Sequence, residues 1–204
     1  MSYMSEAEAA DLTFSDGARA VELARDAVTA YVINGQREHP GSMIDAFYER
    51  TGALVRLESA VGRGQLRGCA GVYDGSDQLG HAIVEAAITA ASGDSCGSEI
   101  EPAELSSIRV SVCIVRNVVL TDDPVADLEL GLHGVAVEGR GETGWMYPTL
   151  PVEHGWSVYE YLDRTCRKAG LPAGAWEDDD VTVSLIEGQV FRERTPRGDV
   201  QSLD

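Results

Sequence analysis

A candidate functional site lies in residues 66–71, which read LRGCAG directly after a strand-like run. A glycine inside a strand loses packing and β-propensity, so Gly68 and Gly71 indicate a bulge, a neighbouring main chain or a ligand against the backbone. A guanidinium group such as that of Arg67 favours the thiolate form of Cys69, which is the form that attacks electrophiles. Cys69 is therefore a candidate catalytic nucleophile or redox thiol. Arg67, Gly68 and Gly71 are candidate ligand-binding residues.

Each of these residues also has a purely structural interpretation. Free cysteines are among the most buried side chains, so Cys69 is also explained as a small core residue. The planar fork of Arg67 suits a carboxylate or phosphate ligand, but in an acidic chain it equally suits a neighbouring Asp or Glu. The sequence leaves these alternatives open.

His133, at the start of a later strand-like run, is the second candidate catalytic residue. It could act as a base or orient a ligand, and the alternative is a core imidazole with satisfied hydrogen bonds. The acidic run of residues 177–180 could bind a cation or form a solvated turn. Motifs of zinc hydrolases, calcium loops, phosphate loops and serine esterases do not occur, so no metal site and no cofactor are expected.

The composition is strongly acidic. The 204 residues carry a formal net charge of -18, and Lys168 is the only lysine. This balance indicates a salt-adapted, halophilic protein. It argues against nucleic acid as a partner, because phosphate binding depends on clustered Lys and Arg. It also disfavours anionic membranes, and no apolar run approaches the roughly 18 residues of a spanning helix.

The spacing of the cysteines indicates the redox state of their thiols, and the N-terminus indicates where in the cell the protein is located. Cys69, Cys96, Cys113 and Cys166 are widely spaced without a Cys-x-x-Cys pair, which indicates reduced thiols rather than a disulfide framework or a zinc site. The first residues lack the positive start and apolar core of a signal peptide. We therefore expect a cytoplasmic protein.

Hydrophobic periodicity and capping residues predict an α+β fold in which mostly antiparallel sheets pack against helices. Helices are expected over 15–34, with Ser15 or Asp16 as the cap, over 78–92, and after the capping box of Ser157 and Glu160. Strands are expected over 53–58 and 66–73 as a hairpin, then over 108–115, 134–138, and 181–186 with 189–194 as a last hairpin.

The two halves share the order hairpin, helix and strand, which is consistent with a duplicated unit or with coincidence. We expect an acidic leader over 1–14 and one α+β domain over 15–194, with lobes of about 15–124 and 125–194. A polar, frayed tail is expected over 195–204.

Residues 66–71 resemble the Leu-Arg-Gly-Cys-Ile-Gly signature of the AMMECR family. Later blocks of the chain resemble the family in the same order, at residues 130–135 (LGLHGV), 153–156 (EHGW), 166–172 (CRKAGLP) and 189–191 (QVF). The similarity spans about residues 17–193. The acidic composition makes the chain similar to a haloarchaeal-type member of the family.

The resemblance implies two lobes with a cleft between them, and it implies no known reaction. In microbes such proteins look like the A component of the AmmeMemoRadiSam set, so a Memo-like protein and a radical SAM protein are implied as partners. Residues 94–99 (DSCGSE) depart from the Asp-x-Arg-Phe-Pro-Pro-like stretch of relatives, so no role of that arginine carries over.

Two functions remain open at this point. The first is an enzyme or enzyme component that holds a small anionic ligand in a cleft near Arg67 and Cys69, with His133 supplied from the second lobe. The second is a non-catalytic adaptor module whose glycine-rich segment binds a partner protein.

The net charge predicts that stability depends on salt. A surface dominated by one sign repels itself at low ionic strength, and counterions screen this repulsion as the salt concentration rises. We expect the melting temperature to rise when KCl is increased from dilute buffer to molar concentration. Equal melting temperatures at low and high KCl would contradict this expectation.

Overall fold

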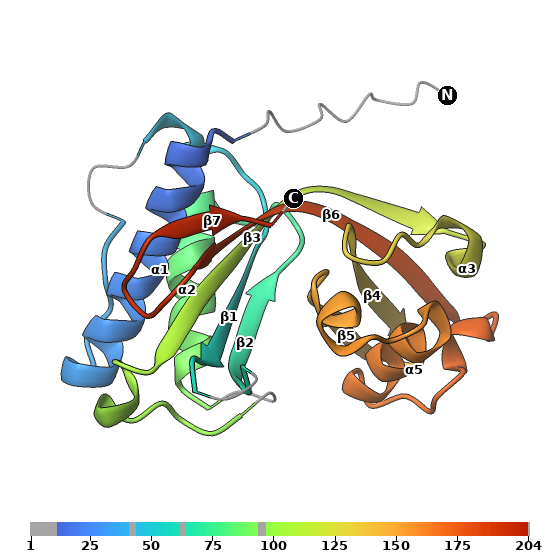
Figure 1. Cartoon of the computed structure of the whole chain (residues 1–204). Coiled ribbons are helices and arrows are strands. Elements are labelled where there is room, and N and C mark those ends of the chain that lie inside the picture. Colours follow the sequence, from blue (N-terminus) through green and yellow to red (C-terminus); the bar gives the residue numbers. More distant parts are fainter. Residues whose placement is uncertain (1–11, 41–43, 62–63, 94–96, 204) are drawn as a thin grey trace. The chain divides into compact units, whose positions relative to one another are not determined.

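The computed structural model describes residues 12–40, 44–61, 64–93 and 97–203, and Figure 1 colours them along the sequence. The chain divides into two compact units.

The unit boundaries differ from the expected lobes of about 15–124 and 125–194. Unit 1 runs to residue 116 and resumes at residue 189, and unit 2 comprises residues 117–188. The difference arises because the end of the chain returns to unit 1.

Unit 1 contains a sheet with two long helices. Its helices are α1 (Phe14–Asn34) and α2 (Leu79–Ala91), with the 3-10 turns η1 (Asp45–Tyr48) and η2 (Pro102–Glu104). Its strands are β1 (Ala53–Ser59), β2 (Leu66–Val72), β3 (Ile108–Thr121), β6 (Val181–Glu193) and β7 (Val200–Ser202), of which β3 and β6 continue into unit 2. The strand order is β2-β1-β3-β6, with β7 paired to β6, and β1 is antiparallel to both its neighbours.

Helix α1 is capped by Thr13, in a capping box with Asp16, so the expectation of Ser15 or Asp16 as the cap is wrong. The side chain of Thr13 accepts from the backbone N–H of Asp16 at 3.2 Å, and the Asp16 carboxylate accepts from the backbone N–H of Thr13 at 3.0 Å. The helix ends at Gly35, whose φ of 61° is left-handed. No described helix, α1 included, combines the length and the apolar character that crossing a bilayer requires.

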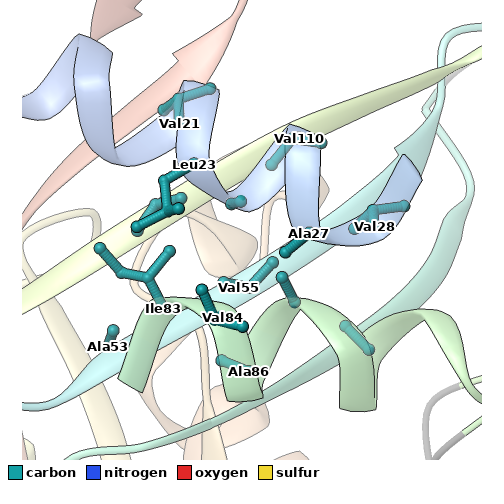
Figure 2. Packing of buried hydrophobic residues seen from close by; sticks show 14 of the residues in the cluster. Val21, Leu23, Ala27, Val28, Ala53, Val55, Ile83, Val84, Ala86 and Val110 are labelled. Carbon is teal, nitrogen blue, oxygen red and sulfur yellow. The ribbon is translucent and has the colours of Figure 1, made fainter. Parts of the chain in front are cut away.

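The core of unit 1 packs α1 and α2 against one face of the sheet, as Figure 2 shows. Valine, leucine, isoleucine and alanine side chains from both helices interlock there with side chains from β1 and β3. Successive side chains of a strand point to opposite faces, so Arg56, which follows the core residue Val55, projects from the other face of the sheet.

Unit 2 combines strands with the amphipathic helix α5 and shorter helices. It contains β4 (His133–Gly139), β5 (Glu142–Met146), α3 (Pro124–Asp127), α4 (Leu150–His154), α5 (Val158–Lys168) and η3 (Ala175–Glu177). The strand order is β6-β4-β5. The predicted capping box of Ser157 and Glu160 is confirmed at the start of α5. A Cβ atom at Gly144 would lie 2.6 Å from Ala169, so the end of α5 packs directly on β5.

Two expectations about the end of the chain are wrong. The segments 181–186 and 189–194 form the single strand β6 rather than a hairpin, because Gly188 has no left-handed φ and the backbone continues extended through it. The reversal occurs later, where Gly198 N–H donates to the carbonyl of Thr195 and Arg197 has a φ of 58°. Residues 195–204 therefore contain the paired strand β7 rather than only a frayed tail.

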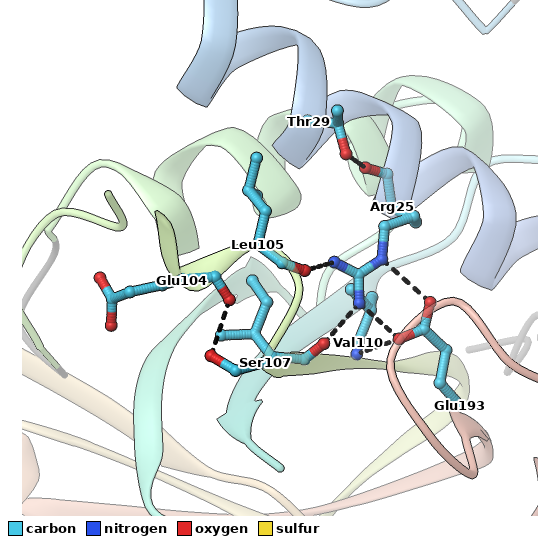
Figure 3. Close-up of polar contacts among 8 residues, drawn as sticks. Arg25, Thr29, Glu104, Leu105, Ser107, Val110 and Glu193 are labelled. Atoms are coloured by element: carbon cyan, nitrogen blue, oxygen red, sulfur yellow. Dashed lines mark hydrogen bonds and ion pairs between the residues drawn. The ribbon is translucent and has the colours of Figure 1, made fainter. Parts of the chain in front are cut away.

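An ion pair between Arg25 and Glu193 is buried in unit 1 (Figure 3). Arg25 Nε donates to Glu193 Oε1 at 2.9 Å, and Glu193 Oε2 also accepts from the backbone N–H of Val110 at 3.0 Å. The same guanidinium group donates to the carbonyls of Ile108 and Leu105. These hydrogen bonds offset the loss of water from both charges and fix α1 to β3 and β6.

We expect Glu193→Ala to destabilise unit 1 strongly. The substitution leaves the Arg25 charge buried and uncompensated, which costs about 3–5 kcal/mol. The matched control is Glu22→Ala, which removes the exposed partner of Arg19 on the same helix and costs less than about 1 kcal/mol. Denaturant unfolding in molar KCl measures both, and equal losses would contradict the role assigned to the buried pair.

Candidate functional site

Close backbone packing within unit 1 explains why residues 68 and 71 of the LRGCAG segment are glycines. A Cβ atom at Gly68 would lie 2.0 Å from the carbonyl oxygen of Ala90, because α2 packs directly on β2 there. Gly71 has a φ of +141°, and a Cβ atom would lie 2.1 Å from the carbonyl oxygen of Ala53. The register of β1 on β2 also shifts opposite Arg67. A bulge and a neighbouring main chain, two of the three expected explanations, are therefore observed.

Arg67 forms a two-point ion pair with Glu104. Arg67 Nε lies 2.8 Å from Glu104 Oε1, and Nη2 lies 3.0 Å from Oε2. The hydrogen bond from Arg67 lowers the pKa of the Glu104 carboxyl, and the bond to Glu104 raises the pKa of Arg67. Glu104 Oε2 also accepts from the backbone N–H of Glu101, so the pair ties β2 to η2. A carboxylate of the chain thus occupies the fork of Arg67.

Cys69 on β2 is 6% exposed and forms a disulfide bond in the structure. The expectation of a reduced thiol is therefore wrong for this residue. Cys113 and Cys166 carry buried thiols, and burial raises the pKa of the Cys166 thiol. Cys96 lies outside the described residues. A disulfide sulfur is no nucleophile, so a catalytic role for Cys69 requires prior reduction.

His133 begins β4 and is held by the loop before it. Its Nδ1 accepts the backbone N–H of Glu129 at 3.0 Å. A neutral imidazole that accepts at Nδ1 carries its proton at Nε2, and this atom lies 3.7 Å from Glu187 Oε1. Glu187 Oε2 accepts from Asn117 Nδ2 at 3.4 Å. This arrangement suits His133 for donating to a ligand or orienting one, rather than for accepting a proton at Nε2.

The expected site residues divide between the two units. Arg67, Gly68, Cys69 and Gly71 lie on β2 in unit 1, and His133 lies in unit 2. Their catalytic and ligand-binding roles stay predictions.

A charged cluster lies on the face of the unit 1 sheet opposite α1 and α2. It comprises Arg56 and Glu58 from β1, Arg109 from β3 and Arg192 from β6, and we call it the arginine cluster. Arg56 Nη2 lies 2.8 Å from Glu58 Oε1. Arg109 Nη2 and Arg192 Nη1 lie 2.9 Å and 3.9 Å from Glu58 Oε2. One carboxylate therefore contacts three guanidinium groups from three strands.

The arginine cluster has a buried floor and a partly open rim. The side chains of Arg56 and Glu58 are each 2% exposed, whereas those of Arg109 and Arg192 are 23% and 16% exposed. Arg109 Nε is buried and has no hydrogen-bond partner among the described residues. Gly64 lies beside this rim, where a Cβ atom would be 3.3 Å from Arg109 Nη2. An unsatisfied buried donor costs about 1–3 kcal/mol, which the ion pairs of the cluster must offset.

Cys69 lies beside the arginine cluster in the sheet register. Cys69 is the register partner of Arg56, and Arg56 is in turn the register partner of Ser111 on β3. Directly opposite residues of antiparallel strands have Cβ atoms about 4.5–5.5 Å apart on the same face. In this register the cationic residue directly opposite Cys69 on the neighbouring strand is Arg56 and not Arg67.

Sequence reasoning missed the arginine cluster. Its signal in the sequence is the alternation of Arg56, Glu58 and Arg109 with apolar residues, which ordinarily indicates a solvated face. The register that pairs Glu58 with Arg109 is visible only in the folded sheet.

The acidic run of residues 177–180 is partly neutralised by Arg140. Arg140 Nε donates to Asp180 at 2.9 Å and Nη2 donates to Asp178 at 2.7 Å. The hydrogen bond from Arg140 lowers the pKa of the Asp180 carboxyl. Within the described ranges, no group of three or more His, Cys, Asp or Glu residues is placed to hold a metal ion. These contacts fit the interpretation of the run as a solvated turn.

Known proteins resemble this chain over most of its length. The AMMECR1 family model matches residues 21–191. A protein of Halobacterium salinarum is 67% identical over 197 residues, which cover 93% of this chain and 94% of that protein. A protein of Methanopyrus kandleri is 34% identical over 199 residues, which cover 95% of this chain and 96% of that protein.

A solved structure has the same fold. The crystal structure of an uncharacterized protein from Pyrococcus horikoshii matches with a TM-score of 0.84 at 30% identity, covering 92% of this chain and 96% of that chain. The chain therefore belongs to the AMMECR1 family, as its motifs indicated, and the predicted α+β fold is confirmed. The similarity to the Halobacterium protein is consistent with a halophilic origin of the acidic composition.

We expect Arg67→Gln to reduce stability in a pH-dependent way. Because the pKa of Glu104 is lowered in the folded state, the pair contributes stability above the ordinary carboxyl pKa and loses it as the pH falls through the lowered value. The pair is partly exposed, so the loss at neutral pH is about 1 kcal/mol or less. Melting temperatures of wild type and variant should converge as the pH falls below the ordinary carboxyl pKa, and a difference that stays constant into acid would contradict the assignment.

Proposed function

We propose that the protein binds a small anion at the arginine cluster, beside Cys69, as an enzyme or as a component of one. The observation that carries this proposal is the contact of three guanidinium groups with the single carboxylate of Glu58. The contrast with Arg67 is informative, because Arg67 meets one carboxylate in a matched two-point pair.

Two physical arguments favour an anionic ligand. Arg109 and Arg192 both approach Glu58 Oε2, so two cationic groups share one carboxylate oxygen at the rim and would attract a second anion. The Arg109 side chain is also 23% exposed at the rim, so its guanidinium group can donate a hydrogen bond to a ligand oxygen. Both arguments support a ligand that is negatively charged and accepts hydrogen bonds.

The chemistry of the rim favours an oxyanion. Guanidinium groups present a rigid fork of donors that matches carboxylate and phosphate oxygens. The buried pair of Arg56 and Glu58 forms a floor that fixes Arg109 and Arg192 before a ligand arrives, which reduces the entropy that binding would cost. The proposal therefore moves the anion site from Arg67 to the arginine cluster and keeps it next to Cys69.

Calorimetric titration tests the proposal directly. Inorganic phosphate, and acetate in a separate arm, would be titrated into the wild type, Arg109→Gln and Arg192→Gln in the same molar KCl. Loss of one charged hydrogen bond is worth about 1.5–3 kcal/mol, so we expect at least one of the two probes to bind roughly 10- to 150-fold more weakly to each variant.

The matched control is Arg67→Gln. The Arg67 side chain is 20% exposed, close to the values for Arg109 and Arg192, and it lies in the same sheet with its fork taken by Glu104. Its affinity for the probe should stay within about twofold of wild type. Absence of binding of both probes to the wild type, or equal losses in all three variants, would refute the proposed site.

A further inference from the structure

We infer that unit 1 has a second binding site, which takes a free apolar α-amino acid in a cavity between α1 and the turn that joins β6 to β7. The inference goes beyond the proposed function. The cavity lies on the side of the sheet that α1 covers, whereas the arginine cluster lies on the opposite face.

The cavity is large enough for a small molecule. Its volume is about 350 Å³, within the range of roughly 300–1,000 Å³ that small-molecule sites have. One wall is a face of α1 that includes Val21 and Asp26, and the other wall includes Arg197 of the turn and Val200 of β7. Apolar and charged side chains therefore meet in the same cavity.

The buried ion pair of Arg25 and Glu193 also lines the cavity (Figure 3). Its guanidinium group donates to Glu193 and to two backbone carbonyls, and its carboxylate also accepts from the backbone N–H of Val110. Because these two charges are already matched, the pair adds no net charge to the cavity. A charged ligand would have to be recognised at the walls.

Asp26 and Arg197 supply opposite charges on the two walls without pairing. Within the described part of the chain, the side chains of these residues form no ion pair and no hydrogen bond, either with each other or with other residues. Glu22, the other carboxylate on this face of α1, is paired with Arg19 at 2.8 Å. The two unmatched charges therefore suit a ligand that carries one charge of each sign.

The electrostatics of Asp26 fit an incoming ammonium group. Burial raises the pKa of the Asp26 carboxyl, and the carboxylate of Glu22 raises it further, so the charged form of Asp26 is disfavoured. An ammonium group beside Asp26 would stabilise that charged form. Arg197 lowers the pKa of the same carboxyl, which shows that its guanidinium group is within electrostatic reach of Asp26.

A free apolar α-amino acid matches all of these features. Its ammonium group can donate hydrogen bonds to Asp26, and its carboxylate matches the donor fork of Arg197. Its side chain would lie against Val21 and Val200. Such a zwitterion has no net charge, so the net charge of -18 on the chain does not repel it as it repels a simple anion.

An NMR titration of the isotope-labelled full-length protein with L-leucine in molar KCl tests the inference. We expect saturable shifts of the backbone amide signals of Gly198 and Val200, which line the cavity. 3-Methylbutylamine and 4-methylpentanoate keep the apolar part of leucine but only one of its two charges. Each should bind at least about threefold more weakly than L-leucine, because one exposed ion pair is lost.

Two variants remove the charges of the cavity one at a time. Asp26→Asn and Arg197→Gln should each weaken the binding of L-leucine at least about threefold. The charge-matched controls are Asp199→Asn and Arg194→Gln, because these exposed residues flank the same turn and do not line the cavity. Both controls should bind L-leucine as tightly as the wild type.

Three results would overturn the inference. They are the absence of saturable shifts at Gly198 and Val200, binding of either single-charge probe as tight as that of L-leucine, and equal losses in the cavity and control variants. The titrations with phosphate and acetate use other variants on the other face of the sheet. Failure of the amino acid site would therefore leave the arginine cluster standing, and the reverse also holds.

Discussion

The contact of Glu58 with three arginine side chains is the interaction on which the proposed chemistry of this protein depends. It joins β1, β3 and β6 on one face of the unit 1 sheet. On the opposite face, Glu193 at the end of β6 pairs with Arg25 of α1. Consecutive residues of β6, Arg192 and Glu193, thus connect the strand to a charged network on each face, as the alternation of side chains along a strand requires.

The acidic composition explains why an anion site in this protein needs a cluster of arginines. A chain of net charge -18 repels anions over most of its surface, so anion binding needs local positive charge that is held in place and shielded from the rest. Arginine suits this purpose better than lysine because its guanidinium group is planar, weakly hydrated and always charged. A buried carboxylate at the centre keeps three such groups together, at a desolvation cost that the ion pairs must offset.

Much of the fold could be predicted from the sequence because local signals determine it. Three such signals act within a few residues, and each predicts an element that the structure contains. They are the helix end at Gly35, the capping box of Ser157 and Glu160, and the alternation along β1. The LRGCAG motif likewise indicated the family. Tertiary context overrode local signals at Gly188, where a turn-forming residue lies inside the continuous strand β6.

The candidate site was less predictable because its determinants are long-range. The partner of Arg67 is Glu104, which is remote in sequence, and only the folded chain brings the two together. The disulfide of Cys69 and the register that sets Arg56 against it depend on the same long-range pairing. Spacing along the chain singled out the strand β2, whereas the arginine cluster is assembled from β1, β3 and β6 by the register of the sheet.

The most direct measurement of the central claim is anomalous scattering from crystals of the wild type in molar KBr. Bromide is an anion that scatters anomalously and competes for sites of positive charge. The account predicts a bromide ion in contact with the guanidinium groups of Arg109 and Arg192. Bromide sites elsewhere on the protein, with none at these two side chains, would contradict it.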